Sequence, residues 1–402
     1  MPLRVCMVSY SFYDNDNRVR RYAEILAKTG HAVDIISLRA LDGPFDRING
    51  VNIYRVQGRR MNERGKWDYL FRILRFFFIA LYHVSRNHLR EPYDLVHVHN
   101  VPDFLVFAAI IPKLARKRIV LDIHDILPEF YAAKFHVDEN STIFKMMLLV
   151  ERVSCSFSDH VIVSNHIWYK KLIARSVNPG KCSVIMNYPD PSTFHQKPRT
   201  RKHDNFVIIY PGTLNYHQGV DIAIKSLSII KKKYPKVEFH VYGDGGDKIN
   251  LEKLVKDSDL GDIVIFKGRI PINKIAEEMS NADLGVVPKR DDGFGGEAFS
   301  TKILEFMSLG VTVVVSGTKI DTYYFNDSVV KFFKPGDVDD LANSILQLIQ
   351  DQGMRKGLAE NALKFVEDFS WENRKSEYLG LVNRLNKCKV GEPGRLPGTH
   401  YT

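Results

Sequence analysis

Short apolar runs alternate with segments of helical period along almost the whole chain. Runs that are apolar at successive positions, rather than at every second one, are typical of parallel strands covered on both faces. The first half therefore predicts strands at 3–10, 33–38, 51–56, 95–99, 119–124, 160–164 and 183–186, and the second half predicts strands at 206–210, 237–242, 263–267, 284–287, 312–316 and 329–332.

The segment between the first two strands shows the helical period most clearly. Its apolar residues Val19, Tyr22, Ala23 and Leu26 follow the i, i+3, i+4, i+7 stripe, and Gly30 stands where a helix commonly ends. Strands alternating with such helices predict an α/β protein with two doubly wound, Rossmann-like domains. We expect ligands where the strand ends of the two sheets face each other across a cleft.

Composition suggests where one domain ends and the next begins. The polar, proline-containing segment 191–205 has no period and reads as a linker. The predicted domains are 1–190 and 206–370, followed by a helix at 371–387 and a Gly- and Pro-containing flexible tail at 388–402.

Charge is distributed unevenly between the halves of the chain. Residues 1–205 carry 31 Lys and Arg against 20 Asp and Glu, whereas residues 206–402 carry 26 against 27. The net charge of +10 therefore resides in the first half, which favours an anionic partner such as a membrane or a phosphorylated acceptor.

The segment 66–90 combines arginines with many aromatic and aliphatic residues. It is either a basic amphipathic helix lying in a membrane interface or a domain helix with a thick buried face. The positive charge of this half favours a peripheral contact with anionic membrane. The apolar run 76–82 is far shorter than the ~20 residues that span a bilayer. With four scattered cysteines and no signal peptide, we expect a cytoplasmic protein, membrane-associated through 66–90.

The most informative segment is GFGGEAFSTKILEFMSLGVTVVVSG, residues 293–317. A glycine-rich loop entering a helix presents unpaired backbone N–H groups that suit a phosphate, and Lys302 adds positive charge in the first turn. Glu305 is placed to accept ribose hydroxyls, and Glu297 to reach hydroxyls of a sugar. The alternative is a plain turn followed by two solvated glutamates.

Here the sequence resembles a known family. The segment 293–317, together with YPGTLNYHQGVDIAI (210–224), HVYGDGG (240–246), FKGRIPINKIAEEMSNADLGVVP (266–288), DIHDILPEF (122–130) and NDNRVRRYAEILAKTGHAVDIISL (15–38), is similar to the retaining glycosyltransferases of the GT-B fold, family 4. The resemblance spans nearly the whole chain. It implies a hexosyltransferase whose second domain binds a nucleotide-sugar donor and whose first domain binds the acceptor, with helix 371–387 packing back onto the first domain.

The resemblance also implies residue roles. His124 and Glu297 would be catalytic, and Asn17, Arg18 and His99 would contact the acceptor. The donor would be held by Gly212, Thr213, Gln218, Arg269, Ile270, Lys289, Phe299, Ser300, Thr301, Lys302 and Glu305. No essential metal or cofactor is expected.

One departure from the family pattern concerns charge. Many relatives carry a basic pair in G-R-x-x-x-x-K-G after the first strand of the donor domain. Here Thr213 and Gln218 occupy those positions, so Lys302, Lys289, Arg290 or Arg269, helped by backbone amides at 212–213, must balance a leaving diphosphate.

Two further patterns have competing interpretations. His97 and His99 alternate in an extended segment and could bind a metal, but no cysteine or third histidine has suitable spacing, so we expect one to be packed and the other to point at the cleft. The glycines of 243–246 make either a tight turn or a phosphate cradle, and the turn is favoured.

The overall prediction is transfer of a sugar to a hydroxyl of an acceptor glycan, carried on a lipid, in polysaccharide or envelope glycan assembly. A nucleotide-sugar epimerase and a non-catalytic sugar-nucleotide-binding homologue are the alternatives. No organised platform for nucleic acid is found.

Overall fold

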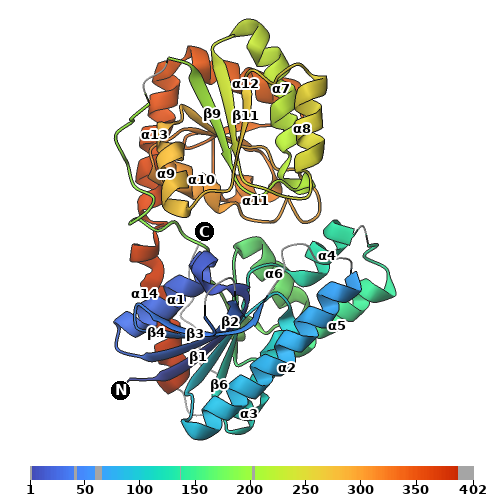
Figure 1. Cartoon of the computed structure of the whole chain (residues 1–402), viewed down its shortest axis with the longest axis vertical. Helices are drawn as coiled ribbons and strands as arrows, with labels where there is room; N and C mark the ends of the chain where they lie inside the picture. The colour runs from blue at the N-terminus through green and yellow to red at the C-terminus, as the bar shows by residue number, and fades with distance from the viewer. Residues whose placement is uncertain (1, 40–42, 59–65, 136, 202–203, 388–402) are drawn as a thin grey trace. The chain divides into compact units, whose positions relative to one another are not determined.

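The chain folds into two compact units in the computed structural model (Figure 1). The model describes residues 2–39, 43–58, 66–135, 137–201 and 204–387, so the predicted tail at 388–402 lies outside the described residues. The first unit comprises residues up to Met186 together with the segment from Lys375, and the second comprises Asn187–Arg374. Each unit is described by itself below.

The first unit is built on one sheet of eight strands in the order β3-β4-β2-β1-β5-β6-β7-β8. Neighbouring strands are parallel except β3 and β4, which pair in antiparallel register. Among the described strands of this unit, only β3 was not predicted. This short edge strand has exposed positions and lacks the apolar pattern used to predict strands. The strands are β1 (Arg4–Phe12), β2 (Ala32–Arg39), β3 (Phe45–Ile48), β4 (Val51–Gly58), β5 (Leu95–His99), β6 (Arg118–Ile123), β7 (His160–Val163) and β8 (Cys182–Val184).

Helices connect these strands, as expected for parallel neighbours. None of the described helices is long and apolar enough to cross a membrane. The helical elements of the first unit are η1 (Tyr13–Asn15), α1 (Asn17–Lys28), α2 (Lys66–Arg90), η2 (Asp103–Ala109), α3 (Ile110–Leu114), α4 (Leu127–Phe135), α5 (Thr142–Phe157), α6 (His166–Arg175) and η3 (Pro179–Lys181).

The last helix, α14 (Trp371–Lys387), passes from the second unit into the first. Its residue Tyr378 is almost fully buried and stacks on Tyr22 of α1, with ring centroids 4.1 Å apart. The end of the chain therefore contributes a side chain to the interior of the first unit.

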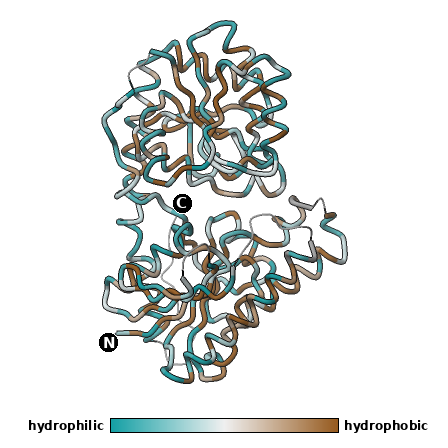
Figure 2. The backbone as a smooth tube through the Cα atoms, in the orientation of Figure 1, coloured by the Kyte–Doolittle hydropathy of each residue, from teal (hydrophilic) through white to brown (hydrophobic). Residues whose placement is uncertain are grey.

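The second unit contains a sheet of six parallel strands in the order β11-β10-β9-β12-β13-β14. The prediction of two Rossmann-like α/β units is thus confirmed. Figure 2 shows the apolar strands running through the middle of each unit, where the cores lie. The strands are β9 (Phe206–Pro211), β10 (Val237–Tyr242), β11 (Val264–Gly268), β12 (Leu284–Val287), β13 (Val313–Ser316) and β14 (Lys331–Phe333).

The remaining helices pack on this second sheet (Figure 1). The sheet separates two apolar cores, one on each face, and these helices cover them. They are η4 (Tyr216–Gln218), α7 (Val220–Lys233), α8 (Lys248–Asp257), α9 (Ile272–Asn281), α10 (Thr301–Ser308), α11 (Lys319–Tyr324), α12 (Val338–Gln350) and α13 (Gln352–Glu367).

The strand order reverses once in each sheet. In the first unit the order turns between β1 and β5, and in the second between β9 and β12. At such a point the loops leaving the carboxyl ends of two neighbouring strands run to opposite faces and leave a crevice, which is where ligands bind in open α/β sheets. The two reversal points are therefore the places to look for function.

Candidate active site

In the second unit, the reversal point brings together three of the predicted donor-binding residues. Gly212 and Thr213 directly follow β9, and Lys289 lies two residues after β12. The backbones of these two loops approach closely, because a Cβ at Gly219 would lie 2.0 Å from the carbonyl oxygen of Pro288. Gly219 also has a positive φ of 65°, so glycine is required there on both counts.

Lys302, in the first turn of α10, extends to this point. Its Nζ donates to Oε1 of Gln218 at 2.9 Å and lies 3.4 Å from the hydroxyl of Tyr210. The same hydroxyl donates to the carbonyl of Thr213 at 2.8 Å. Burial lowers the pKa of the Lys302 ammonium group to about 8, although Glu305 acts in the opposite direction. A cation with neutral partners therefore lies at the reversal point.

Gly212 makes room for that cation. A Cβ at Gly212 would lie 2.5 Å from Cε and 2.7 Å from Nζ of Lys302. The backbone N–H of Gly212 donates to the carbonyl of Tyr242, so the expectation that this amide serves a phosphate is wrong. The backbone of Gly243 approaches this loop closely, because a Cβ at Gly243 would lie 1.7 Å from the Gly212 carbonyl oxygen. Gly243 and Gly245 thus serve close packing of the two loops.

Lys289 is buried and supports the glycine-rich loop. Its ammonium group lies 2.9 Å from a carboxylate oxygen of Asp321 and donates to the carbonyl of Ala298 at 2.7 Å. Asp321 is fully buried. The ion pair therefore ties the loop between β12 and α10 to α11, and the positive charge of Lys289 is already balanced.

The two glutamates of the motif lie on either side of the start of α10. Glu297 is buried in the loop and its carboxylate pairs with the exposed Lys319 at 2.8 Å. Glu305 is partly buried within α10. The residues between them begin the helix: Phe299 packs against Tyr324, Ser300 is the N-cap position, and Thr301 is the first helical residue.

The remaining predicted donor residues lie along the same edge of the sheet. Arg269 and Ile270 follow β11, the edge strand, where Arg269 is exposed and Ile270 packs partly against the core. Nη2 of Arg290 lies 2.7 and 2.8 Å from the two carboxylate oxygens of Asp221, and the guanidinium lies over the ring of Tyr216. Its charge, like that of Lys289, is already balanced.

In the first unit, a buried carboxylate organises the polar residues. Asp122 of β6 is fully buried and receives both Nε and Nη2 of Arg18, at 2.9 and 2.7 Å. Burial alone raises the pKa of Asp122, but Arg18 and His124 outweigh it and hold the pKa well below its ordinary value. Arg18, which was predicted to contact the acceptor, is itself only 6% exposed and forms this internal ion pair.

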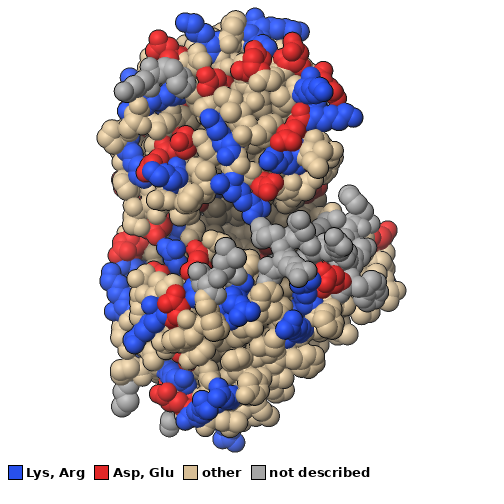
Figure 3. Space-filling view, viewed as in Figure 1, with Lys and Arg blue, Asp and Glu red and all other residues tan. Residues whose placement is uncertain are grey.

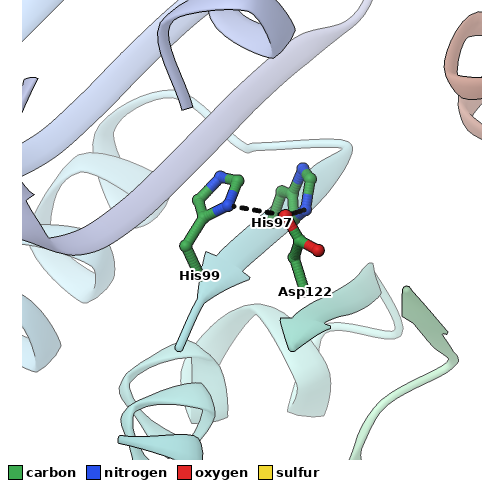
Figure 4. Close-up of side chains that lie close together, drawn as sticks. All are labelled: His97, His99 and Asp122. Carbon is green, nitrogen blue, oxygen red and sulfur yellow. Dashed lines mark hydrogen bonds and ion pairs between the residues drawn. The ribbon is translucent and has the colours of Figure 1, made fainter. Parts of the chain in front are cut away.

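The two alternating histidines are both fully buried beside Asp122 (Figure 4). The prediction that one of them faces a ligand is therefore wrong, because Tyr22 of α1 and Tyr378 of α14 pack against these rings. Nδ1 of His99 lies 3.1 Å from the carboxylate of Asp122, and Nδ1 of His97 lies 2.9 Å from the hydroxyl of Tyr378. Burial lowers the pKa of both histidines, although Asp122 acts in the opposite direction.

This group of His97, His99 and Asp122 has ligand atoms close enough together to hold a metal ion. Arg18 already occupies both oxygens of the carboxylate, however, and a guanidinium beside a divalent cation would repel it. The donor set therefore fits a hydrogen-bonded network better than a metal centre.

His124 and Asn17 are the predicted residues of this unit that remain partly exposed. Nε2 of His124 lies 3.0 Å from the Asp122 carboxylate, and its side chain is 22% exposed. The side-chain oxygen of Asn100 accepts the His124 backbone N–H at 2.8 Å. Asn17 begins α1, one residue before Arg18. The network thus fixes the ring of His124 at the carboxyl end of β6.

Three residues of these two clusters were not predicted from the sequence. Asp122 carries a usable signal, because an aspartate within an apolar strand needs a buried cation. Tyr210 and Tyr378 carry no such signal, because an aromatic residue among apolar neighbours is explained by simple core packing.

Comparison with known proteins agrees with this organisation. Residues 16–188 match the model of the glycosyl transferase 4-like domain, and residues 192–365 match that of the glycosyl transferases group 1. The fold is that of a sucrose-phosphate synthase from Thermosynechococcus elongatus, with a TM-score of 0.79 at 19% identity over 95% of this chain and 99% of that one. The chain is a GT-B glycosyltransferase.

Other similar proteins agree with this glycosyltransferase assignment. The Schizosaccharomyces pombe gpi3 subunit of phosphatidylinositol N-acetylglucosaminyltransferase is 25% identical over 376 residues, covering 91% of this chain and 77% of the relative. The Anabaena protein HepE in complex with UDP has a TM-score of 0.69 at 18% identity, covering 95% of this chain and all of that one.

Proposed function

We propose that this glycosyltransferase moves a hexose from a nucleoside diphosphate sugar to a hydroxyl of a lipid-linked acceptor glycan, with retained configuration and in polysaccharide or envelope glycan assembly. The observation that carries the proposal is Lys302, a cation held by neutral partners at the strand-order reversal of the second unit. Fixed positive charge in a partly desolvated site stabilises a departing diphosphate. HepE, a structural neighbour, binds UDP, which favours a nucleotide donor for this chain as well.

The residues around α10 suggest how a donor is bound. We assign the diphosphate to Lys302 and the start of α10, the ribose hydroxyls to Glu305, and hydroxyls of the transferred sugar to Glu297. The pair of Glu297 with Lys319 orients that carboxylate. Arg269 and Ile270, after β11, are assigned to the base.

The proposed reaction needs no separate strong base. The acceptor oxygen forms a bond to the anomeric carbon while the bond from that carbon to the phosphate oxygen breaks. The acceptor proton passes to the leaving phosphate oxygen, and Lys302 stabilises the negative charge there. We assign His124, fixed by Asp122, to the reacting sugar. Because Lys302 supplies the charge, we propose that no metal ion is essential, so activity should survive excess EDTA.

A lipid-linked acceptor is supported by the outer face of α2. Its inner face is buried, as the alternative interpretation of 66–90 required, yet Phe71, Phe78, Tyr82 and Leu89 are each at least 60% exposed. Figure 3 shows a largely uncharged surface over this helix. The exposed arginines 75, 86 and 90 flank it and complement an anionic bilayer. The gpi3 relative is named for transfer to a phosphatidylinositol, which is a lipid.

Vesicle binding tests this membrane contact. We expect the protein to sediment with vesicles of phosphatidylglycerol and phosphatidylcholine but not with pure phosphatidylcholine, and the variant Phe71→Ser/Phe78→Ser to lose most of this binding. Ile249→Ser, an equally exposed residue on α8, is the matched control. Equal binding by all three proteins contradicts the contact.

A donor screen tests the proposed activity. Thermal shifts are measured with UDP-, GDP-, TDP- and ADP-sugars, since a ligand that binds only the folded state raises the melting temperature. We expect one donor class to stabilise the protein and Glu305→Ala to lose that shift, whereas Glu360→Ala, an exposed glutamate of α13, keeps it. If no nucleotide sugar stabilises the native protein, the proposed function is wrong.

A further inference from the structure

Four basic side chains of the second unit were candidates to balance the diphosphate, and the structure separates them. The charges of Lys289 and Arg290 are balanced by Asp321 and Asp221. Arg269 is exposed beyond β11, which is two strands from β9, or about 10 Å. Only Lys302 lies at the reversal point with no carboxylate within 4 Å of its ammonium group among the described residues.

Lys302 also lies where the loop after β9 lacks charge. Gln218 occupies the second basic position of the family pattern, and its Oε1 accepts from Nζ of Lys302 at 2.9 Å. The hydroxyl oxygen of Tyr210 lies 3.1 Å from the same Oε1, and Nζ lies 4.8 Å from the Tyr210 ring centroid. A side chain from α10 has therefore reached the polar tip of a residue 84 positions earlier.

We infer that Lys302 supplies, from α10, the positive charge that a loop residue at position 218 supplies in relatives with a basic pair. Tyr210 and Gln218 are positioning residues that hold its ammonium group against the backbone of Gly212. The inference rests on the proposed function, because it assigns the diphosphate of the donor to this cation.

There is a physical reason why the partner of Lys302 at position 218 carries no charge. A lysine at position 218 would bring a second ammonium within about 3 Å of Lys302, and two like charges at that distance repel strongly in a partly buried site. A glutamate at 218 would cancel the charge of Lys302. A glutamine accepts a hydrogen bond, carries no charge, and leaves the cation available to a ligand. A lysine at position 218 and a lysine at position 302 are therefore mutually exclusive ways of placing the charge. Exchanging one for the other is a direct test.

The test is a charge exchange measured by calorimetry. Binding of the nucleoside diphosphate of the best donor is compared in the native protein, Lys302→Gln, Gln218→Lys and the double variant Lys302→Gln/Gln218→Lys. We expect each single variant to bind at least tenfold more weakly, and the double variant to recover to within about threefold of native affinity. Lys364→Gln, an exposed lysine of α13, is the matched control and should bind as the native protein does.

Different failures have different meanings. If no nucleoside diphosphate binds the native protein, the proposed function fails, and the inference with it. If the native protein binds and Lys302→Gln binds equally well, the proposed function stands and the inference is overturned. If the double variant binds no better than Lys302→Gln while its melting temperature stays native, the charge is not exchangeable and the inference is again overturned.

A second variant tests the positioning role. Gln218→Glu places a carboxylate beside Lys302 and should both weaken diphosphate binding and move the alkaline loss of affinity to higher pH. A residue with a merely structural role would not move that pH. An unchanged pH profile in a folded Gln218→Glu protein contradicts the role assigned to position 218.

Discussion

The polar clusters at the two reversal points differ in how far their charges are balanced. In the first unit Asp122 receives Arg18 in a bidentate pair and is also close to His99 and His124. In the second unit, the hydrogen-bonding partners of Lys302 among the described residues are the amide of Gln218 and the phenol of Tyr210. The first cluster balances its charge internally and holds His124, although Nη1 of Arg18 and Nε2 of His97 and His99 have no hydrogen-bond partner among the described residues. The second places a positive charge beside neutral partners and is suited to receive an anion.

The largest effect expected from this difference is on stability. Asp122→Asn leaves the buried guanidinium of Arg18 without a counter-charge, which should lower the free energy of unfolding of the first unit by about 3–5 kcal/mol. Hydrogen exchange of β5 and β6 amides under urea measures it, with β9 as an internal reference. Glu277→Gln breaks the exposed pair with Lys274 and should cost under about 1 kcal/mol. A loss that small for Asp122→Asn would contradict the buried ion pair.

Protonation of a second buried group, His160, should destabilise the first unit at acidic pH. Burial, with Arg384 and Lys181, lowers the pKa of His160 to about 4, from about 6.5 in an unfolded chain. The folded pKa is the lower one, so the stabilisation is complete above pH 6.5 and is lost as the pH falls toward 4. We expect His160→Gln to remove about 1–3 kcal/mol of the native decrease in stability between these pH values. The exposed His195 supplies the control, since His195→Gln should leave the decrease unchanged.

Loss of space beside Lys302 should affect binding more than stability. A Cβ at Gly212 would overlap Cε and Nζ of Lys302, and the end of a lysine side chain can move away. Gly212→Ala should therefore weaken nucleoside diphosphate binding about tenfold by calorimetry while the fold persists. Gly246→Ala places its Cβ in open space and should bind normally. Native affinity in Gly212→Ala would show that the ammonium group need not lie against this backbone.

The sequence predicted the two sheets well and the clusters only in part. Strands such as β10 and β12 were found with their observed bounds, because runs buried on both faces leave a local pattern. Lys302 was found because a lysine at a helix start after glycines is also local. Its contact with Gln218 was not, because it joins residues far apart in the chain and depends on how α10 packs against β9.

In the first unit, too, the contacts that join residues distant in the sequence were not predicted. One of His97 and His99 was expected to point at the cleft, yet both are buried, and the ring of His99 packs against Tyr22 beside Asp122. Arg18 was expected at the acceptor from the family resemblance, and in the structure it pairs with Asp122, 104 positions later. Charge balance between distant residues leaves no periodic trace in the sequence.

The smallest predicted effect is the pH dependence of donor binding, and it separates the two clusters most sharply. The groups around Lys302 are Glu305, which favours its charged form, Lys289, which opposes it, Asp321 and the phenol of Tyr210. With its pKa near 8, most of the ammonium is charged at pH 7 and most is neutral at pH 9. Only the charged form attracts the diphosphate, so affinity should fall about threefold to tenfold over this interval. Comparison with Lys302→Gln, whose affinity should be low and nearly constant, separates the titration of Lys302 from that of the nucleobase of the ligand. A parallel decrease in both proteins would mean that some group other than Lys302 titrates, and the charge at the reversal point would then not be the one that binds the donor.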